Sequence, residues 1–244
     1  MNKKKARWRK LDNAAKLYSA ASNKKDTRVF RFYCELKEEV NPDVLQEALN
    51  QTIEIFPTFL MVLRKGFFWH YLEPCNLRPI VKEEYKEPCS RLYIKDKKTL
   101  LFEVTYYKKR INFEVFHVLT DGTGATEFLK ELVKNYLYLI HKVNGLEPVS
   151  LLPEDMTVQD QEVDSFLKYY SKDQKRPKKR KLHAFQIRKR KKDGNHLHVH
   201  ESVVSVQAVL KRSRELGVSM TVFLTALFMM AINEEMSKMQ KKKP

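Results

Sequence analysis

A histidine, an aspartate and a glycine stand close together in the segment Phe116-His117-Val-Leu-Thr-Asp121-Gly122. The ordinary pKa of histidine is near 6.5, so a neutral imidazole in this segment can accept a proton at neutral pH. His117 is therefore the first candidate for a general base. A pattern as short as HxxxDG also fits a histidine in a turn or a core, so its setting has to distinguish the two.

The residues around this segment predict a strand that leads directly into a helix. Within 110–117, three apolar residues alternate with their neighbours at the period of a β-strand: Ile111, Phe113 and Val115. Within 123–137, apolar residues recur at helical spacing: Phe128, Leu129, Leu132, Val133, Tyr136 and Leu137. Asp121 or Thr123 can cap this helix. His117 would then lie at a strand end, where a substrate can reach it.

Further strands and helices are expected to support the site. A strand over 100–107 and the loop Lys108-Lys109 predict an antiparallel hairpin with 110–117. Asn41 and Pro42 are typical of a helix start, which predicts a helix over 41–56. The other predicted elements of this half are a helix over 7–18, a strand over 28–36, a hairpin of 59–63 with 67–72, and a short strand over 77–81.

The chain after residue 143 has a different composition. Residues 144–165 include Gly145, Pro148 and Pro153 and predict a linker between domains 1–143 and 166–244. In the second domain, a helix over 206–216 is expected to end at Gly217, and Ser219 to start a helix over 220–236. Its apolar residues predict a wide buried face: Val222, Phe223, Ala226, Leu227, Met230 and Ala231.

The formal net charge of +17 is concentrated in three basic tracts. They hold six basic residues within 3–10, eleven within 175–192 and three within 241–243, and no acidic residue lies inside any of them. The rest of the chain is close to neutral, which argues against nucleic-acid binding by the whole domain. The tract 175–192 fits a solvated excursion, or contact with acidic lipid or nucleic acid.

Several site classes are not indicated by the sequence. The three cysteines are odd in number and lack CxxC spacing, so neither disulfides nor a zinc site is expected, and a reducing cytoplasm fits. His196, His198 and His200 would share one strand face, but no other ligand stands nearby, so an exposed face is favoured over a metal site. Residues 218–232 are too short an apolar segment to span a membrane, which predicts a soluble protein.

The HxxxDG junction, between a hairpin and a helix, resembles the signature of the chloramphenicol-acetyltransferase-like superfamily. This superfamily includes peptide-synthetase condensation domains and alcohol O-acyltransferases. Residues 9–18 (RKLDNAAKLY) are similar to the opening of its bacterial alcohol-acetyltransferase-like members, and residues 210–227 (LKRSRELGVSMTVFLTAL) to the helix pair that begins their second half. The anchors follow the family order over nearly the whole chain.

The resemblance implies an α/β (α+β) fold with a mixed, largely antiparallel sheet and flanking helices, as the first half of a two-subdomain acyltransferase. It implies that His117 removes a proton from an acceptor hydroxyl or amine, which attacks the thioester of acyl-CoA, for example acetyl-CoA. Asp121 would have a structural role, with an at least partly buried carboxylate that forms an ion pair with an arginine. Gly122 would let the backbone turn closely beside the site. No bound cofactor is implied, because acyl-CoA is a co-substrate.

Two departures from the family pattern are visible. Phe116 stands where condensation domains usually have a second histidine, which favours a stand-alone acyltransferase. The second-half segment with the family's DFGWG-like motif is absent, so the chain is expected to be a fragment, a half that a partner completes, or a decayed relative. The alternative function is a non-catalytic module that binds nucleic acid or a membrane surface through 175–192.

Overall fold

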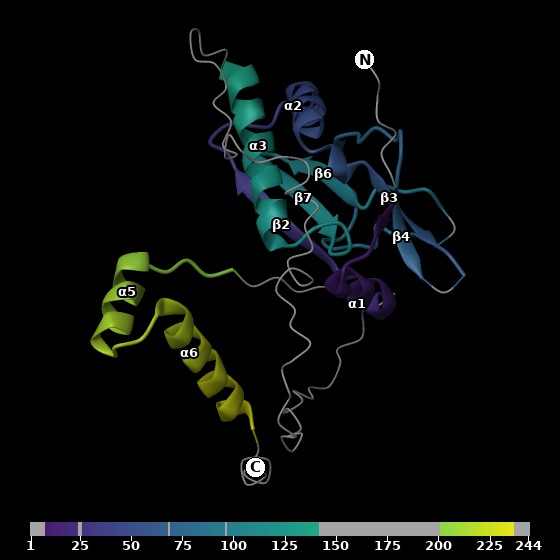
Figure 1. Cartoon of the computed structure of the whole chain (residues 1–244). Coiled ribbons are helices and arrows are strands. Elements are labelled where there is room, and N and C mark those ends of the chain that lie inside the picture. The colour runs from purple at the N-terminus through teal and green to yellow at the C-terminus, as the bar shows by residue number, and fades with distance from the viewer. Residues whose placement is uncertain (1–7, 24–25, 68, 96, 142–200, 237–244) are drawn as a thin grey trace. The chain divides into compact units, whose positions relative to one another are not determined.

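The computed structural model describes residues 8–23, 26–67, 69–95, 97–141 and 201–236 (Figure 1). The chain divides into two compact units, Met1–Lys172 and Asp173–Pro244. In the first unit, the described residues form two largely antiparallel sheets with flanking helices, which confirms the predicted fold class. Four predicted features lie outside the described residues and stay predictions: the linker 144–165, the basic tracts 175–192 and 241–243, and the histidines within 196–200.

The larger sheet has four strands in the order β2-β7-β6-β5 (β2 Val29–Glu35, β7 Arg110–Phe116, β6 Phe102–Tyr107, β5 Lys82–Glu83). Strand β7 is antiparallel to both β2 and β6, whereas β5 runs parallel to β6. The predicted hairpin of β6 and β7 is confirmed, and Lys108 in its turn has a positive φ of 50°. Strand β7, which leads to His117, is thus paired along both edges.

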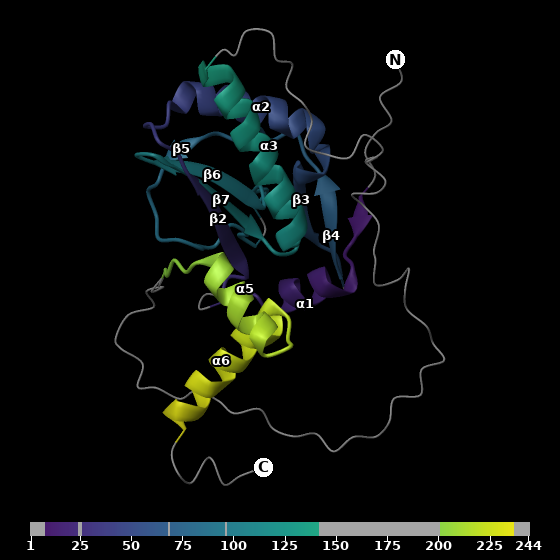
Figure 2. The same ribbon diagram turned by 90° about the vertical axis from the view of Figure 1, so that its left-hand side faces the viewer.

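Two helices, α2 (Pro42–Ile55) and α3 (Gly122–His141), pack against each other over one face of the larger sheet (Figures 1 and 2). Helix α2 begins as predicted, because the Asn41 side chain accepts hydrogen bonds from the backbone N–H groups of Asp43 and Val44. The predicted helix after the HxxxDG segment is confirmed as α3, which continues four residues beyond the predicted end at Leu137.

The core lies between this sheet and the two helices. Phe113 of β7 stacks on Phe128 of α3 with ring centroids 4.6 Å apart, and both side chains are fully buried. Ile111 and Val115 are also fully buried, but the residues of the opposite face (Asn112, Glu114 and Phe116) are buried as well, so the alternation gives the strand period and does not distinguish a buried face from an exposed one. On the opposite face, the ring of Phe116 stacks on Tyr93 from the segment before β6.

The smaller sheet has the order β1-β4-β3 (β1 Arg9–Lys10, β4 His70–Pro74, β3 Met61–Lys65). The predicted hairpin exists, but its turn lies at 66–69 and not at 64–66. Pro57 opens a short 3₁₀ helix, η1 (Pro57–Phe59), so β3 begins two residues later than predicted. The backbone N–H of Gly66 then donates to the carbonyl oxygen of Trp69 at 2.7 Å and closes the turn.

The helix predicted over 7–18 is wrong in its first half. Arg9–Lys10 form β1, and helix α1 occupies Asn13–Ala21. The Asp12 side chain accepts a hydrogen bond from the backbone N–H of Ala15 at 2.6 Å, which sets the start of α1 after the strand.

The strand predicted over 77–81 is also wrong, because these residues have no regular secondary structure and the strand begins at Lys82. The Gln46 side chain of α2 accepts a hydrogen bond from the backbone N–H of Val81 and donates one to the carbonyl oxygen of Pro79. The side chain of Gln46 thus makes the backbone hydrogen bonds that a neighbouring strand was expected to make.

The second unit contains helices α5 (Val206–Glu215) and α6 (Met220–Glu235). Gly217 has φ +66°, and the N–H groups of Gly217 and Val218 bond the carbonyls of Arg214 and Ser213, which is the helix ending that glycine favours. Within this unit, taken by itself, α6 has no buried residue, so the wide buried face that its sequence predicts is absent from the described residues. Among the described residues, no helix alone has the length and hydrophobicity to cross a bilayer; only α5 and α6 together do, with an 88° bend between them.

Candidate active site

His117 lies directly after β7 and five residues before α3. Its backbone N–H donates to the carbonyl oxygen of Arg28 at 3.0 Å, which extends the pairing of β7 with β2 by one residue. The backbone N–H of Leu119 donates to the carbonyl oxygen of Phe116 at 2.8 Å and turns the chain immediately afterwards. The main chain of His117 is therefore fixed on both sides.

The imidazole of His117 lies between two aromatic rings. Tyr18 of α1 stacks on it with ring centroids 4.1 Å apart and an interplanar angle of 14°. Phe30 of β2 contacts it with centroids 4.6 Å apart and an angle of 49°. Two separate elements, α1 and β2, thus contact the ring, and His117 as a whole remains partly exposed.

The two ring nitrogens of His117 differ. Of these two nitrogens, Nδ1 is buried and has no hydrogen-bond partner in the described part of the chain, whereas Nε2 is not in this state. A buried nitrogen without a partner can neither reach a substrate nor exchange a proton with water directly. Nε2 is therefore the nitrogen that can take part in proton transfer.

Asp121 caps helix α3, as its sequence position allowed. Its Oδ1 accepts a hydrogen bond from the backbone N–H of Gly124 at 2.9 Å. The expectation of a partly buried carboxylate is wrong, because Asp121 is exposed at the helix start. Within residues 8–141 and 201–236, apart from the gaps, no arginine forms an ion pair with Asp121.

The steric requirement for glycine lies at Gly124 and not at Gly122. A Cβ atom added to Gly122 would meet only Cζ of Phe32 at 4.0 Å, which is ordinary contact. A Cβ added to Gly124 would lie 2.2 Å from Oγ1 of Thr120, so something would have to shift. The expected role of Gly122 is therefore corrected, since the close approach occurs two residues later.

A network of largely buried ion pairs connects the two strands that lead to the site. Arg31 of β2 faces Glu114 of β7 in the strand register, and its Nε bonds Oε1 of Glu114 at 2.9 Å. Its Nη1 bonds Oε1 of Glu84 at 2.6 Å, and Nη2 of Arg110 bonds the other oxygen of Glu84 at 2.9 Å. These four residues join β2 and β7 to the segment after β5.

This network continues toward the site through Cys89. The backbone N–H of Cys89 donates to Oε1 of Glu114, and its carbonyl oxygen accepts from Oγ1 of Thr27 at 2.7 Å. Thr27 precedes Arg28, whose carbonyl oxygen bonds His117. Burial raises the pKa of the Cys89 thiol and the Glu114 charge raises it further, so this cysteine is held in its thiol form.

An apolar groove of about 680 Å³ opens between β2 and α3. Its lining includes Phe32 and Cys34 of β2, and Leu129, Val133 and Leu137 of α3. The ring of Phe32 lies edge-on to Phe30, with centroids 5.6 Å apart, and Phe30 contacts His117. One row of aromatic side chains thus connects the groove with the imidazole.

Sequence reasoning identified the imidazole but not the residues that hold it. Tyr18 lies in a segment with a family-like sequence and Phe30 in an alternating strand, yet neither pattern specifies contact with a histidine about 90 residues away. Arg28, which bonds His117, has a positive φ of 55°, and no sequence pattern indicated this. In the described residues, no group of three or more His, Cys, Asp or Glu is arranged to hold a metal ion.

Neither a known protein-family model nor a curated protein matches the chain. Among solved structures, similarity is found to a variant starter condensation domain of rhizomide synthetase in complex with C8-CoA (14% identity, TM-score 0.48, 57% of this chain and 38% of that one). It is also found to the first condensation domain of CDA synthetase (14%, 0.45, 57% and 41%). A third is polyketide synthase associated protein 5 from Mycobacterium tuberculosis (16%, 0.44, 60% and 36%). This chain spans about two fifths of the length of these structures.

Proposed function

We propose that the chain carries the general base of an acyl-CoA-dependent O-acyltransferase of the alcohol-acetyltransferase type. The observation that supports this most directly is the setting of His117, at a strand-to-helix junction and between two aromatic rings. Its buried Nδ1 leaves Nε2 as the nitrogen for proton transfer. The family resemblance of the HxxxDG segment supplies the reaction type.

In the proposed reaction, Nε2 of neutral His117 accepts the proton of an acceptor hydroxyl. The oxygen attacks the carbonyl carbon of the acyl thioester, and the carbon–sulfur bond then breaks. The ester is released, and the CoA thiolate takes the proton back from the imidazolium. Neutral His117 is restored, so no cofactor is consumed and acyl-CoA acts only as a co-substrate.

The surrounding residues orient the imidazole and do not relay charge in this proposal. The rings of Tyr18 and Phe30 restrict rotation of the imidazole, so little orientational freedom is lost when the substrate binds. Asp121 fixes the first turn of α3 through its hydrogen bond to Gly124. The apolar groove beside Phe32 offers a place for the apolar part of a substrate.

The test is turnover of acyl-CoA with a panel of alcohols, followed by release of free CoA thiol. General-base assistance contributes about 10²–10⁴-fold, or roughly 3–5 kcal/mol of barrier. We expect His117→Ala to lower kcat by about this factor. Its melting temperature should fall only modestly, because the variant loses the ring contacts with Tyr18 and Phe30 but no hydrogen bond through Nδ1.

His141→Gln is the matched control, since this exposed histidine lies at the opposite end of α3 from the HxxxDG junction. We expect it to retain full turnover. The proposal is contradicted if His117→Ala keeps most of the activity, or if the wild-type chain releases no thiol with any acyl-CoA and alcohol pair.

A further inference from the structure

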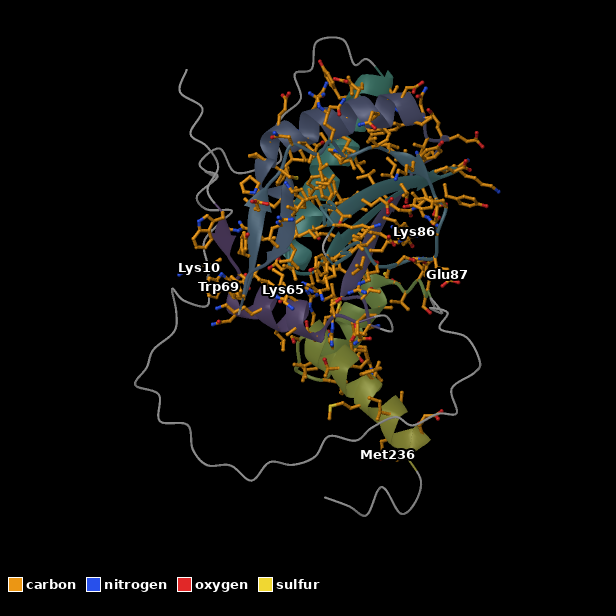
Figure 3. All side chains as sticks on the ribbon, turned by 90° about the vertical axis from the view of Figure 1, so that its right-hand side faces the viewer. Lys10, Lys65, Trp69, Lys86, Glu87 and Met236 are labelled. Atoms are coloured by element: carbon orange, nitrogen blue, oxygen red, sulfur yellow. The ribbon has the colours of Figure 1, made fainter. Side chains whose placement is uncertain are left out.

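Aromatic and basic side chains gather on the smaller sheet and its turn, and all of them are exposed except the half-buried Tyr71. We call this set the hairpin surface: Trp8, Lys10, Lys65, Phe67, Trp69 and Tyr71. Figure 3 labels Lys10, Lys65 and Trp69, which lie at the same end of this sheet. None of these residues belongs to the candidate active site.

The strand register places several of these side chains on one face. Lys10 of β1 is opposite Tyr71 of β4, and Tyr71 is opposite Arg64 of β3. Directly paired residues point to the same side of a sheet, so these three side chains share a face. Lys65 is opposite His70, one residue further along β3, so it points to the other face, at the end of the strand beside the turn. Trp8 lies edge-on to Tyr71, with ring centroids 6.1 Å apart, and so extends the same face.

The aromatic residues of this surface are unusually exposed. Phe67 in the turn is 97% exposed, Trp69 is 59% exposed and Trp8 is 55% exposed. Large apolar side chains in water oppose stability, and a cluster of them rimmed by polar residues marks an interaction surface. The hairpin surface is therefore suited to a partner with an apolar component.

The charge on the hairpin surface is basic. Arg64 forms an ion pair with Glu73 at 3.2 Å, whereas neither Lys10 nor Lys65 has an ion pair within the described residues. A complementary partner therefore has to be anionic as well as partly apolar.

We propose that the hairpin surface docks on an anionic lipid bilayer. The rings of Phe67, Trp69 and Trp8 enter the interface between headgroups and acyl chains, where tryptophan and tyrosine are favoured. Lys10, on the face of Tyr71, and Lys65, at the strand end beside the turn, contact the negatively charged headgroups. This inference does not depend on the proposed acyltransferase reaction.

A bilayer fits this surface better than a nucleic acid does. Single-stranded nucleic acid is bound by aromatic rings along a basic groove, where successive bases stack on them. Here the most exposed ring, Phe67, projects from a turn and has no polar atom in its side chain. A projecting turn can enter a lipid interface without rearrangement of the sheet behind it.

Tryptophan fluorescence tests the proposal directly, because Trp8 and Trp69 are the two tryptophans of the whole chain. The full chain is titrated with vesicles of phosphatidylcholine alone and with vesicles of phosphatidylcholine and phosphatidylserine in equal amounts. We expect a blue shift and co-sedimentation with the anionic vesicles, and much weaker effects with the neutral ones. Added salt should reduce the binding.

Two variants separate the apolar and the basic contributions. Phe67→Ser should weaken partitioning into the anionic vesicles by about tenfold, since a large side chain no longer leaves water. Lys10→Gln combined with Lys65→Gln should weaken it by about fivefold for each charge removed. Ile80→Ser and Lys37→Gln are matched controls at exposed positions away from this surface, and they should bind as the wild type does.

Four results would overturn the proposal. These are no blue shift with anionic vesicles, equal binding to neutral vesicles, unchanged binding by Phe67→Ser, and binding lost only on deletion of 175–192. A fluorescence change with a single-stranded DNA oligonucleotide but not with vesicles would assign the surface to nucleic acid instead.

Discussion

The junction between β7 and α3 combines a hydrogen-bonding requirement with a steric one. Asp121 caps the helix, and a Cβ atom on Gly124, which donates to that cap, would collide with the Thr120 hydroxyl unless that side chain shifted. Of the two glycines in this turn, Gly122 stands in the HxxxDG pattern and Gly124 does not. The sequence pattern thus drew attention to the glycine that the geometry constrains less.

We predict that Gly124→Ala destabilises the protein by roughly 1–3 kcal/mol, the range for an inserted methyl group that forces its neighbours to move. Gly122→Ala should be neutral or slightly stabilising, because alanine favours helix more than glycine does. Urea unfolding at neutral pH measures both. Thr120→Ala in the Gly124→Ala background removes the nearest atom and should restore most of the loss. Equal destabilisation by the two single variants would contradict this assignment.

At the same scale, His117 was identifiable from the sequence but its environment was not. Hydrogen-bonding and acid–base capacity follow from residue type and local spacing, so an imidazole at a strand end and a capping aspartate could be predicted. The contacts of Tyr18 and Phe30 with His117 depend on how distant elements pack. The ion pair expected for Asp121 came from a family resemblance, and in the described residues a helix-capping role stands in its place.

At the scale of elements, a buried ion pair joins the two strands that position the site. The side chains of Arg31 and Glu114 are 11% and 2% exposed. We predict that Arg31→Met costs about 3–5 kcal/mol of unfolding free energy, because it leaves Glu114 buried without its counter-charge. Arg64→Met is the control, since its partner Glu73 is half-exposed, and it should cost less than about 1 kcal/mol. Similar losses in both variants would mean that burial does not set the strength of the pair.

The same network predicts a dependence of stability on pH. Burial by itself raises the pKa of Glu84, but hydrogen bonds and charges from Arg31 and Arg110 outweigh it, and the pKa of Glu84 is lowered overall. The stabilisation is therefore present above about pH 4.3, the ordinary pKa of glutamate, and is lost as the pH falls through the lower folded-state pKa.

We expect the unfolding free energy of the wild type to fall more steeply below about pH 4.3 than that of Glu84→Gln. Urea titrations in a series of acidic buffers measure the two slopes. Parallel curves for the two proteins would show that Glu84 has the same pKa in the folded and unfolded states. Glu83→Gln, at an exposed position nearby, serves as a control for the loss of one negative charge.

Elements whose ends are set by hydrogen bonds between residues close in sequence were predictable. Elements that depend on contacts between distant residues were not. Asn41 and Pro42 specify the start of α2, and Gly217 the end of α5, because the responsible hydrogen bonds lie within a few residues. The segment 77–81 instead takes its backbone hydrogen bonds from Gln46, more than thirty residues away. Apolar residues alone did not distinguish it from a strand.

At the scale of the whole molecule, helix α6 departs most from expectation. It is apolar on all sides, a composition that is normally buried, yet none of its residues is buried and Phe228 is 65% exposed. The start of α6 was predicted correctly, because Oγ of Ser219 accepts a hydrogen bond from the backbone N–H of Val222. Periodicity predicts that an apolar helix needs a partner, but it cannot specify which surface provides one.

The difference in burial between helices α3 and α6 can be tested by comparing one phenylalanine from each. Phe128 of α3 is fully buried among aromatic rings, so Phe128→Ala should cost about 3–5 kcal/mol and lower the melting temperature. Phe228→Lys should change the unfolding free energy by no more than about 0.5 kcal/mol, as expected for an exposed position, and should reduce light scattering because it removes apolar surface. A large fall in melting temperature for Phe228→Lys would show that α6 is covered in solution. In that case the burial predicted from its sequence would be correct for the protein in solution.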